Sequence, residues 1–599
     1  MSSTYKSSIH LFSDFPRLSK NEWLEKAAQG LSSSDFQALL EGAKREGIRL
    51  KTFYHQDDLS RPFPSPAFSA KMKDSRGWAF QEKMPVCTPG KEKIINKVAL
   101  KALEGGAEGL LFVIDNQSMR EFDWKQLLKD ILTDAISISW LFRGKVPFSL
   151  FQDFPDMKGS IMLAADKWTF SQQAPVSDLI PSVHELMSQP PTHYRCLSVD
   201  ATFLANAGAQ VVQEVGVTLS LLLAFYDRLT DLGHKIEQLI PHTSLSLGTG
   251  SSYLVDMARY RAYRRLLVRL AKAYGVEAAA YDFELRAETS AYNKVSYDQN
   301  MNILRNTTEA MAAAYGGCDQ LCLMPHDGQY GESNHFARRI ARNISHLLRE
   351  ESRAHLVSDP AAGAYAIEQL TDEIGEKAWS YFLMLEEKGG FEQAWHSGFI
   401  EEELRASARL RQQSVDKQQQ VLVGANRYID WEKSAHVADR PQDGQDGLIQ
   451  RLSASFESLR FEMDELAVAR QRPTLLLQPV CKSDKTAFVN ARTAFVEDLF
   501  ASVGIATSLA DTYLEDQLPG KHLLNDKIGL VLLAEDATYA DFLSGWSEQQ
   551  FAQLGVPLFI AGHPSRIAVN TEAFQFIYKG MEVPAFARSI LKKAKIIKA

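Results

Sequence analysis

Cysteine is scarce in this sequence, and the few cysteines form no motif. Five of the 599 residues are cysteine, scattered as Cys87, Cys196, Cys318, Cys322 and Cys481. A disulfide framework needs a denser set in a shorter chain, so that class of protein is excluded. Cys318 and Cys322 have no second Cys or His pair at zinc spacing. We therefore expect no metal-binding residue on this chain.

The sequence also lacks long runs of one charge and long apolar runs. The formal net charge of −8 is spread along the chain, and the basic cluster at residues 592–598 is typical of a solvated tail. We therefore expect no nucleic-acid partner. The longest apolar stretch, Val215–Tyr226, is interrupted by Thr218 and Ser220. It is shorter than the roughly 20 residues that span a bilayer, so no membrane partner is expected.

The beginning of the sequence shows no targeting signal. Its first residues, MSSTYKSSIHLFSDFP, have neither the apolar core of a secretory signal nor the Arg-rich, acid-free composition of a transit peptide. We expect a cytoplasmic protein. A chain of 599 residues that is 45% hydrophobic has enough apolar material for at least two domains.

The sequence contains a rhythm of short apolar runs and longer amphipathic segments. Residues 14–45 have apolar positions at helical spacing and candidate N-caps at Ser19 and Ser34, which predicts a helical arm over residues 1–46. From about Gly47 short apolar runs alternate with amphipathic segments, which indicates a parallel sheet. About eight such units suit a (β/α)8 TIM barrel over residues 47–371. The predicted strands include Gly109–Ile114, Ala135–Phe142, Tyr194–Val199, Val276–Leu285 and Gln320–Met324.

Two further segments follow the barrel. Residues 372–470 are charged and Gln-rich, and the loop ADRPQDGQDG at 438–447 interrupts them, which predicts a helical linker. Residues 471–599 return to an α/β rhythm, which predicts a small doubly wound, flavodoxin-like domain. Its predicted strands are Thr474–Gln478, Ile528–Leu533 and Pro557–Ala561, and its predicted helices are Lys485–Ser502 and Tyr539–Gln553. The predicted fold class is α/β.

The stretch from Asn302 to Thr371 is the most informative part of the chain. It contains NILRNTTEAMAAAYGGCDQL and FARRIARNISHLLREESRAHLVSDPAAGAYAIEQLT. It resembles the barrel domain of the methylmalonyl-CoA mutase family, with its N-x-x-R-x-T-x-E-A-M-A-A-x-x-G-G, F-x-A-R-I-A-R-N and D-P-x-x-G-x-Y-x-x-E-x-L-T. The matching residues are Asn302, Arg305, Thr307, Glu309 to Ala313, Gly316, Gly317, Phe336, Arg339 to Asn343, Asp359, Pro360, Gly363, Tyr365, Glu368, Leu370 and Thr371.

A predicted helix over Asp256–Tyr274 extends the resemblance. The family has a helix of the pattern E-I-A-K-x-R-A-A-R-x-L-W, and Asp256, Ala258, Arg261, Ala262 and Arg264 are in its register. The apolar positions form one stripe and the basic residues lie opposite. We therefore expect one face of this helix to pack on the core and the basic face to be wet.

The residues through which the family binds cobalamin are replaced here. The family places a cobalt-ligating histidine in D-x-H-x-x-G after the first strand of its C-terminal domain. This chain has PVCKSDKTAFVNAR there, without histidine, and its Asp484 predicts a helix N-cap. The family's S-x-L and G-G turns become Ala534-Glu535-Asp536 and Ala561-Gly562-His563-Pro564. We expect Glu535 and Asp536 to repel a phosphodiester, and no cofactor-binding residue on this chain.

The family's substrate-facing residues are replaced as well. Its S-L-H-T-N-x-x-D-E matches Gln320–Gly328, where Asp327 is retained while Cys322 and Met324 stand at the His and Asn positions. The histidine of its Y-H-M-Q-E-A-G-A is Phe203.

The catalytic tyrosine that follows W-x-x-x-Q in the family has no counterpart in Gly77–Lys83. We expect no catalytic residue on this chain. We also expect the apolar side chains of Phe203, Leu323 and Met324 to plug the barrel axis.

The resemblance implies the small, non-catalytic subunit of a bacterial heterodimeric mutase. In such a heterodimer the large subunit binds adenosylcobalamin and interconverts (R)-methylmalonyl-CoA and succinyl-CoA. Residues 14–45 and 372–470 are the candidates for contacts with that partner. One alternative is an independently active cobalamin-dependent acyl-CoA mutase with an atypical cobalt ligand such as His522 or His563. Another is a cofactor-free barrel enzyme, for which the sequence offers no convergent acid, base and nucleophile.

Overall fold

The structure is a computed structural model of the 599-residue chain. It describes residues 19–29, 32, 36, 40, 42–59, 77–115, 122–143, 146–164, 175–191, 193–277, 282–431, 451–480, 486–511, 514, 519–567 and 574–597. Among these residues, no helix combines the length and hydropathy that a membrane span needs. Ser34, Asp484 and the 438–447 loop lie outside the described residues.

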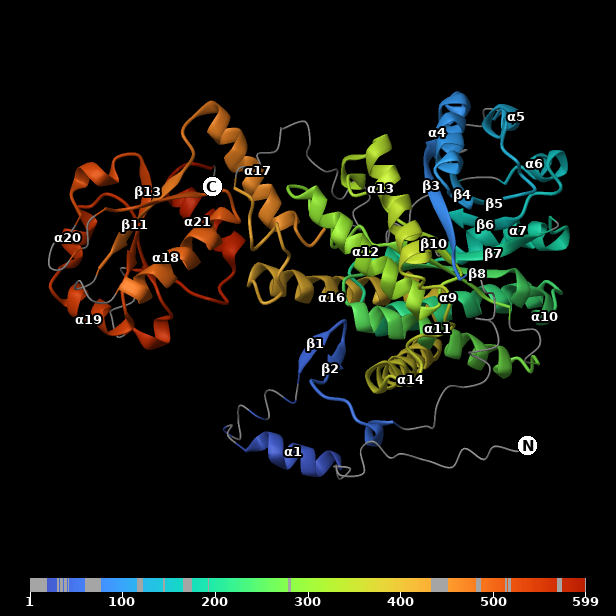
Figure 1. The fold of residues 1–599 in the computed structure, drawn as a ribbon, viewed down its shortest axis with the longest axis horizontal. Helices are drawn as coiled ribbons and strands as arrows, with labels where there is room; N and C mark the ends of the chain where they lie inside the picture. Colours follow the sequence, from blue (N-terminus) through green and yellow to red (C-terminus); the bar gives the residue numbers. More distant parts are fainter. Residues whose placement is uncertain are drawn as a thin grey trace, which may run out of the picture.

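Eight parallel strands close into a barrel in the order β10-β3-β4-β5-β6-β7-β8-β9, and helices surround it (Figure 1). The TIM barrel expected from the sequence is confirmed. The strands are β3 Ala79–Cys87, β4 Gly109–Asp115, β5 Ser137–Arg143, β6 Gly159–Ala164, β7 Tyr194–Asp200, β8 Thr243–Thr249, β9 Glu284–Thr289 and β10 Gln320–Cys322.

The helices between and after these strands complete the barrel layer. They are α4 Glu92–Glu104, α5 Trp124–Leu127, α6 Phe148–Asp153, α7 Pro175–Ser188, α8 Thr202–Asn206, α9 Val211–Asp231, α10 Ile236–Leu239, α11 Tyr253–Ala273, α12 Gln299–Gly316, α13 His335–His346, α14 Tyr365–Glu387, α15 Gly390–His396 and α16 Phe399–Asp416.

Two adjacent glycines of the family motif have different physical roles. A Cβ on Gly316 would lie 2.9 Å from the carbonyl oxygen of Met257 and 2.9 Å from Cβ of Tyr260, so glycine lets α12 approach α11 closely. Gly317 ends α12 with φ 89°, a left-handed conformation that side chains disfavour. The sequence signal here therefore reflects helix packing and helix termination.

Three arginines of the basic face of α11 are buried, which corrects the expectation of a solvent-exposed face, while Arg269 on the same helix is 46% exposed. Arg259, Arg261 and Arg264 are 3%, 0% and 8% exposed, because α9, α12 and α14 pack around α11. Arg261 donates to Asp359 at 2.9 Å and to Glu368 at 2.6 Å. Arg259 pairs instead with Glu214 of α9 at 2.5 Å. Basic residues that are spaced like a solvated face thus form buried ion pairs with segments both before and after α11 in the chain.

The C-terminal domain is a five-stranded parallel sheet in the order β12-β11-β13-β14-β15, which agrees with a flavodoxin-like fold. Its strands are β11 Thr474–Pro479, β12 Ala506–Leu509, β13 Lys527–Leu533, β14 Leu558–Ala561 and β15 Gln575–Ile577, and its helices are α18 Thr486–Ala501, α19 Asp536–Ser544, α20 Glu548–Ala552 and α21 Val583–Lys593. The single helix expected over Tyr539–Gln553 is two helices, because residues Gly545–Ser547 are not helical.

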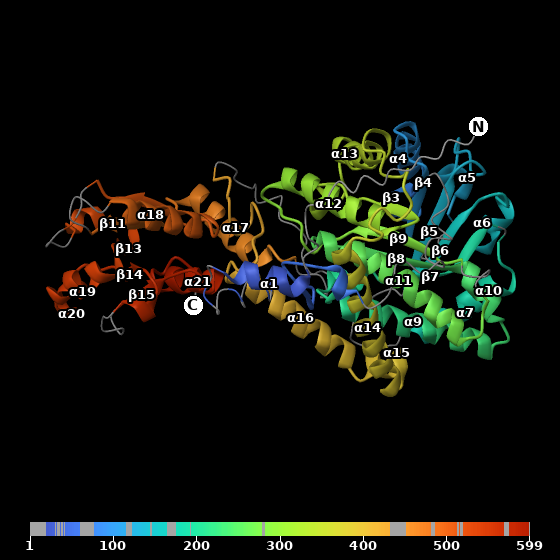
Figure 2. The same ribbon diagram turned by 60° about the horizontal axis from the view of Figure 1, so that its bottom comes forward.

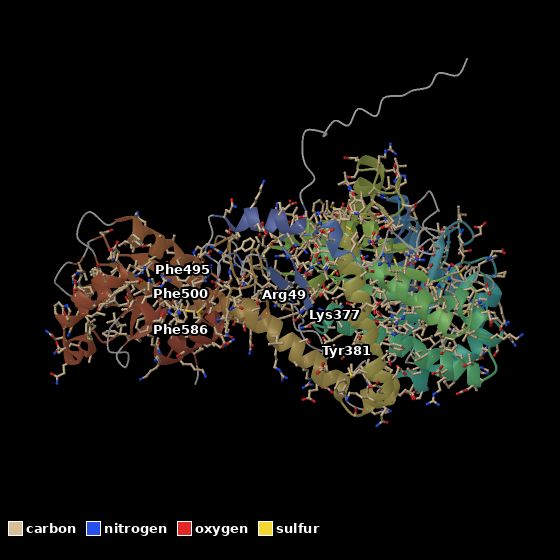
Figure 3. The ribbon with its side chains drawn as sticks, turned by 90° about the horizontal axis from the view of Figure 1, so that it is seen from below. Arg49, Lys377, Tyr381, Phe495, Phe500 and Phe586 are labelled. Carbon is tan, nitrogen blue, oxygen red and sulfur yellow. The ribbon has the colours of Figure 1, made fainter. Side chains whose placement is uncertain are left out.

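Each face of this sheet packs on its own apolar layer. On one face Phe495 and Phe500 of α18 and Phe586 of α21 gather against the strands (Figure 3). On the other face α19 and α20 contribute a second cluster that includes Tyr539 and Phe551. Helices on both faces of a parallel sheet are what the continuous apolar strands require.

The joint between barrel and C-terminal domain is a continuous core. The helix α17 (Ala454–Ala469) lies between the two bodies (Figures 1 and 2). Ser296, in the segment that follows β9, donates from its backbone N–H to Glu457 of α17 at 2.5 Å. Val295 packs in one apolar cluster with Phe456 of α17 and Leu475 of β11. These contacts tie the segment after β9 to both α17 and the C-terminal sheet.

The barrel's apolar core continues beyond residue 371. It begins at Ile48 and includes residues of α14, α15 and α16 as far as Leu404. The segment expected to be a linker therefore covers the barrel with its first helices and joins the C-terminal domain through α17. The domain boundaries at residues 46, 371 and 470 stay a proposal.

The N-terminal segment folds back on its own chain and lies beside α14 (Figure 2). Helix α1 (Lys20–Ala28) begins at the Ser19 cap that the sequence predicts, with a complete capping box. Trp23 stacks on Phe53 at 4.0 Å between ring centroids, and Lys20 pairs with Asp58. The hairpin β1 Ala43–Arg45 and β2 Ile48–Leu50 joins this arm to the barrel.

Candidate functional site

The carboxyl end of the barrel is the first candidate site, because barrel enzymes place their chemistry there. Strand β9 shows which side chains enter it. Leu285 and Ala287 belong to the core outside the barrel, so Glu284, Arg286 and Glu288 point inward. The barrel interior is therefore lined by charge on this strand.

Arg286 occupies the barrel interior with no exposed surface. Its guanidinium donates to Gln320 Oε1 at 2.9 and 3.0 Å, to Ser139 Oγ at 2.9 Å and to Ser160 Oγ at 2.6 Å. It also lies 3.0 Å from the sulfur of Met162. These partners come from β5, β6 and β10, so one side chain bridges the interior.

Glu284 supplies a negative charge close to the Arg286 guanidinium. Its carboxylate accepts from Ser244 Oγ at 2.9 Å and from Gln320 Nε2 at 3.0 Å. Burial lowers the pKa of Arg286, and the nearby Glu284 carboxylate opposes that effect. An arginine guanidinium is not deprotonated in proteins, so Arg286 stays charged. The interior is thus filled by a hydrogen-bonded cation.

A second charged group lies nearer the mouth of the barrel. Lys83 of β3 pairs with Glu288 of β9 at 2.7 Å, and their side chains are 39% and 16% exposed. Burial lowers the pKa of Lys83, but the Glu288 carboxylate outweighs burial and the net shift is upward. A lysine held in its charged form cannot serve as a base or a Schiff-base nucleophile at neutral pH.

Two neighbouring groups are also withdrawn from solvent, since Asp200 is half-buried and Cys322 is buried. Asp200 of β7 accepts from Thr202 N at 2.9 Å and from Thr202 Oγ1 at 2.6 Å, and burial raises its pKa. Burial likewise raises the pKa of the Cys322 thiol to about 12. Because the thiolate is the nucleophile, Cys322 is inert at neutral pH.

The three apolar residues expected to plug the barrel do not do so. Phe203 lies in α8 and meets Trp395 of α15 edge-on at 6.2 Å between ring centroids. Leu323 belongs to the core outside the barrel. Met324 turns toward Gly328, whose Cβ would lie 2.9 Å from its Cγ. The prediction that they plug the axis is wrong, because strand alternation and the turn after β10 direct them elsewhere.

Asp327, the acidic residue retained from the family pattern, is buried and contacts none of the charged residues at the barrel mouth described above. Its Oδ2 accepts from the backbone N–H of Asn334 at 3.1 Å, and Asn334 caps α13 through Ala337 N. It therefore holds the loop before α13.

The segment Gly77–Lys83 divides its side chains between outside and inside. Trp78 is buried and donates from Nε1 to Ser345 Oγ at 2.9 Å. Glu82 faces the helices, where it pairs with Arg342 at 2.5 Å. Gln81 faces the interior and donates to Ser139 Oγ at 3.0 Å. Lys83 is thus the residue of this segment that reaches the barrel mouth.

In the C-terminal domain, Arg492 of α18 lies across the carboxyl end of β13. It donates to the carbonyl oxygen of Ala534 and pairs with Asp536 at 2.5 Å. Burial lowers the pKa of Arg492, but the neighbouring Tyr539 and Asp536 outweigh burial and raise it overall. Asp536 is therefore neutralised within the protein, which corrects the expectation that it faces a ligand as a free carboxylate.

The histidines named as alternative cobalt ligands sit apart from other ligating groups. His563 Nδ1 is 2.7 Å from Ser565 Oγ, and its ring meets Tyr578 edge-on. His522 is exposed in a short 3-10 turn. Within the described part of the chain, no three His, Cys, Asp or Glu residues are grouped to hold a metal. Residues 481–485, where the family carries its ligand, lie outside the described residues.

Sequence analysis did not identify four residues of this site, which are Lys83, Asp200, Arg286 and Glu288. The predicted strand Val276–Leu285 ended where the true strand begins, because apolar content was the criterion. The sequence signal for this strand was the pattern ELRAET, in which charged and apolar residues alternate. Such alternation predicts a half-buried strand. The charged side chains point into the barrel interior only because the sheet closes into a barrel.

Comparisons with known proteins agree with the resemblance in the barrel. The methylmalonyl-CoA mutase family model matches residues 160–477. The methylmalonyl-CoA mutase small subunit of Porphyromonas gingivalis is 29% identical over 588 residues, which cover 92% of this chain and 94% of that protein. The probable methylmalonyl-CoA mutase small subunit of Mycobacterium tuberculosis is 32% identical over 501 residues, 78% of each chain. The methylmalonyl-CoA mutase of Escherichia coli is 29% identical over 279 residues, 46% of this chain and 38% of that protein.

Proposed function

Because this chain belongs to the methylmalonyl-CoA mutase family, we propose that it is the small, non-catalytic subunit of a heterodimeric methylmalonyl-CoA mutase. Members of the family are cobalamin-associated isomerases. In the proposed complex a longer homologous large subunit binds adenosylcobalamin and interconverts (R)-methylmalonyl-CoA and succinyl-CoA. The names of the Porphyromonas and Mycobacterium relatives support this assignment.

The observation that carries the non-catalytic assignment is the position of Arg286. An acyl-CoA substrate needs an open path into the barrel, and here the interior holds a fully buried guanidinium hydrogen-bonded to three other strands. Displacing it would remove the hydrogen bonds that it donates to Ser139, Ser160 and Gln320, which is costly in a closed interior. Lys83 and Cys322 near the mouth are held in unreactive protonation states.

The residues present in the C-terminal domain do not fit adenosylcobalamin. The segment after β11 has no histidine to ligate cobalt. Arg492 and Asp536 pair across the end of β13, where the family uses small residues to admit the nucleotide tail. We therefore assign cobalamin to the large subunit and no cofactor-binding residue to this chain.

The N-terminal arm is our candidate for contact with the large subunit. Helix α1 has no buried residue, and Trp23 on it is 36% exposed although it stacks on Phe53. Exposed tryptophan is enriched at the energetic centres of protein interfaces. Residues 372–470 are the second candidate through the exposed face of α16, where Leu410 is 61% exposed.

The test is co-expression of this chain with a longer homologous mutase chain. We expect the two to co-purify, the complex to bind adenosylcobalamin, and the complex alone to show isomerase activity. Isolated, this chain should self-associate or melt early, and the large subunit should raise its melting temperature in a concentration-dependent way. If the isolated chain is a compact monomer and its melting temperature does not change when the large subunit is added, the proposal is contradicted. A shifted corrin spectrum with this chain alone would favour independent activity.

A further inference from the structure

Two histidines from different elements meet on the helical layer around the barrel. His184 lies in α7, and His234 follows the last residue of α9 by three positions. Nδ1 of His184 is 2.9 Å from Nε2 of His234. The two rings cross at 71°, with their centroids 5.0 Å apart. Both residues are half-buried, so solvent and small ions reach the pair.

The backbone holds both histidines in place. His184 is inside the 14-residue helix α7, which packs against α9. His234 belongs to the turn that ends α9: its N–H donates to the carbonyl oxygen of Leu229 at 3.0 Å, and the N–H of Gly233 donates to that of Thr230 at 2.9 Å. Gly233 has φ 94°. These are the bonds of a Schellman motif, so the separation of the two rings is set by ordered backbone.

The two facing nitrogens share one proton in a hydrogen bond. A neutral imidazole has one N–H and one lone pair. If His184 carries its proton on Nε2 and His234 carries its proton on Nδ1, both facing nitrogens present lone pairs, and the net charge of the pair is unchanged. Two lone pairs at this separation need a cation between them, and a metal ion can take the place of the shared proton.

The separation of the nitrogens selects a class of metal ion. Bonds from imidazole nitrogen to a metal are about 2.0–2.1 Å long, so two nitrogens 2.9 Å apart subtend an angle of about 90° at the ion. That angle is typical of the square-planar or tetragonal sites of Cu(II) and Ni(II). A tetrahedral zinc ion would require a separation of about 3.3 Å.

The donor set agrees with this class. Imidazole suits late first-row transition metals, whereas calcium and magnesium prefer oxygen ligands. No third His, Cys, Asp or Glu of the described residues joins the pair, so water molecules are left to fill the other coordination positions. The two ligands are 50 residues apart in the chain, which is why no local spacing in the sequence indicates them.

We propose that His184 and His234 bind one divalent transition-metal ion of the Cu(II) or Ni(II) class. Nδ1 of His184 and Nε2 of His234 are adjacent ligands, and they replace two water molecules of the hydrated ion. The ion joins α7 to the end of α9. The site lies on the outer layer of the barrel and requires neither cobalamin nor the large subunit, so it goes beyond the proposed function.

Titration of the full-length chain with Cu(II) at pH 7.5, where an ordinary histidine is neutral, tests the proposal. We expect saturable binding of one ion, and an electron paramagnetic resonance spectrum with hyperfine splitting from two imidazole nitrogens. Cu(II) should bind at least about tenfold more tightly than Zn(II), and Ni(II) should compete for the same position. No saturable binding below about 1 mM, or a spectrum with one nitrogen, overturns the proposal.

Histidine variants separate the pair from binding to single surface histidines. His184→Gln and His234→Gln should each weaken Cu(II) binding at least about tenfold, because the second ligand is no longer held beside the first. His522→Gln removes an exposed histidine of the C-terminal domain and should leave Kd unchanged. Circular dichroism confirms that each variant is folded. Equal weakening in all three variants overturns the site.

Thermal unfolding with Ni(II) provides an independent check. An ion that binds the folded pair should raise the melting temperature of the parent and of His522→Gln. The rise should be absent in His184→Gln and His234→Gln. An equal rise in all four chains overturns the placement of the ion. Titration of the same chain with adenosylcobalamin reports on the proposed function alone, so the two proposals can fail separately.

Discussion

Lys83 of β3 and Glu288 of β9 are 205 residues apart in the chain and form a 2.7 Å ion pair that reaches over β10 at the mouth of the barrel. Lysine in this position is charged and already paired. Strand order alone creates this contact, because β9, β10 and β3 are consecutive around the closed barrel.

The first prediction concerns activity. Lys83→Met combined with Glu288→Gln removes the pair without leaving either charge unpaired. In a purified complex with the large subunit, kcat and KM should stay within about twofold of the parent, since a non-catalytic barrel contributes no transition-state contact. Steady-state kinetics of the isomerisation provides the measurement. A loss of about a hundredfold or more in kcat would show that this barrel takes part in catalysis.

The second prediction concerns stability of the barrel. Arg286→Ala should lower the free energy of unfolding by about 3–5 kcal/mol, because it opens a cavity in the closed barrel interior and removes the donor on which Gln320 Oε1 and Ser160 Oγ depend. The shift of the urea midpoint in the barrel's transition measures it. Arg405→Ala is the matched control: Arg405 is 65% exposed and pairs with Glu401 on α16. Its loss should cost at most about 0.5 kcal/mol. Similar shifts in both variants would contradict the structural role of Arg286.

The third prediction concerns the N-terminal arm. Trp23→Ala should weaken association with the large subunit at least about tenfold if α1 lies in the interface, because buried tryptophans dominate interface energies. Surface plasmon resonance with immobilised large subunit measures the change. Leu232→Ala serves as the control, since Leu232 is 49% exposed after α9 and is remote from the arm in sequence. An unchanged Kd for Trp23→Ala would remove the arm from the interface.

The fourth prediction concerns pH. His184 Nδ1 and His234 Nε2 are 2.9 Å apart, and burial, followed by the charge of His184, lowers the pKa of His234 below its ordinary value of 6.5. Below pH 6.5 the unfolded chain then binds more protons at this position than the folded chain. Stability should therefore fall as the pH decreases through this region, and the effect should be absent above it.

His234→Gln isolates that contribution. Thermal unfolding at pH 7.5 and at pH 5.5 should show a smaller loss of melting temperature for the variant than for the parent. His242, whose pKa burial also lowers, is present in both chains and cancels in the comparison. Equal losses in the two chains would assign the acid sensitivity to other groups.

The strands that were predicted from the sequence differ from the strands that were not predicted in the polarity of the side chains that face the barrel interior. Strands β4 and β13 are apolar on both faces and stand out as continuous runs. Strand β8, TSLSLGT, alternates Leu245 and Leu247 with serine and glycine. Half of it faces the polar barrel interior, so it lacks the apolar run that marked the others.

The sequence by itself determined the alternating α/β order, the family motif at residues 302–371 and the replacement of the family's ligand and substrate residues, because these are properties of residue type and spacing. Only the tertiary structure decided which side chains enter the barrel. Closure of eight strands turns the charged side of β9 inward and brings Ser139, Ser160 and Gln320 around Arg286. It also sends Phe203 outward to Trp395. A contact between residues more than a hundred positions apart depends on strand order and register, which no local pattern specifies.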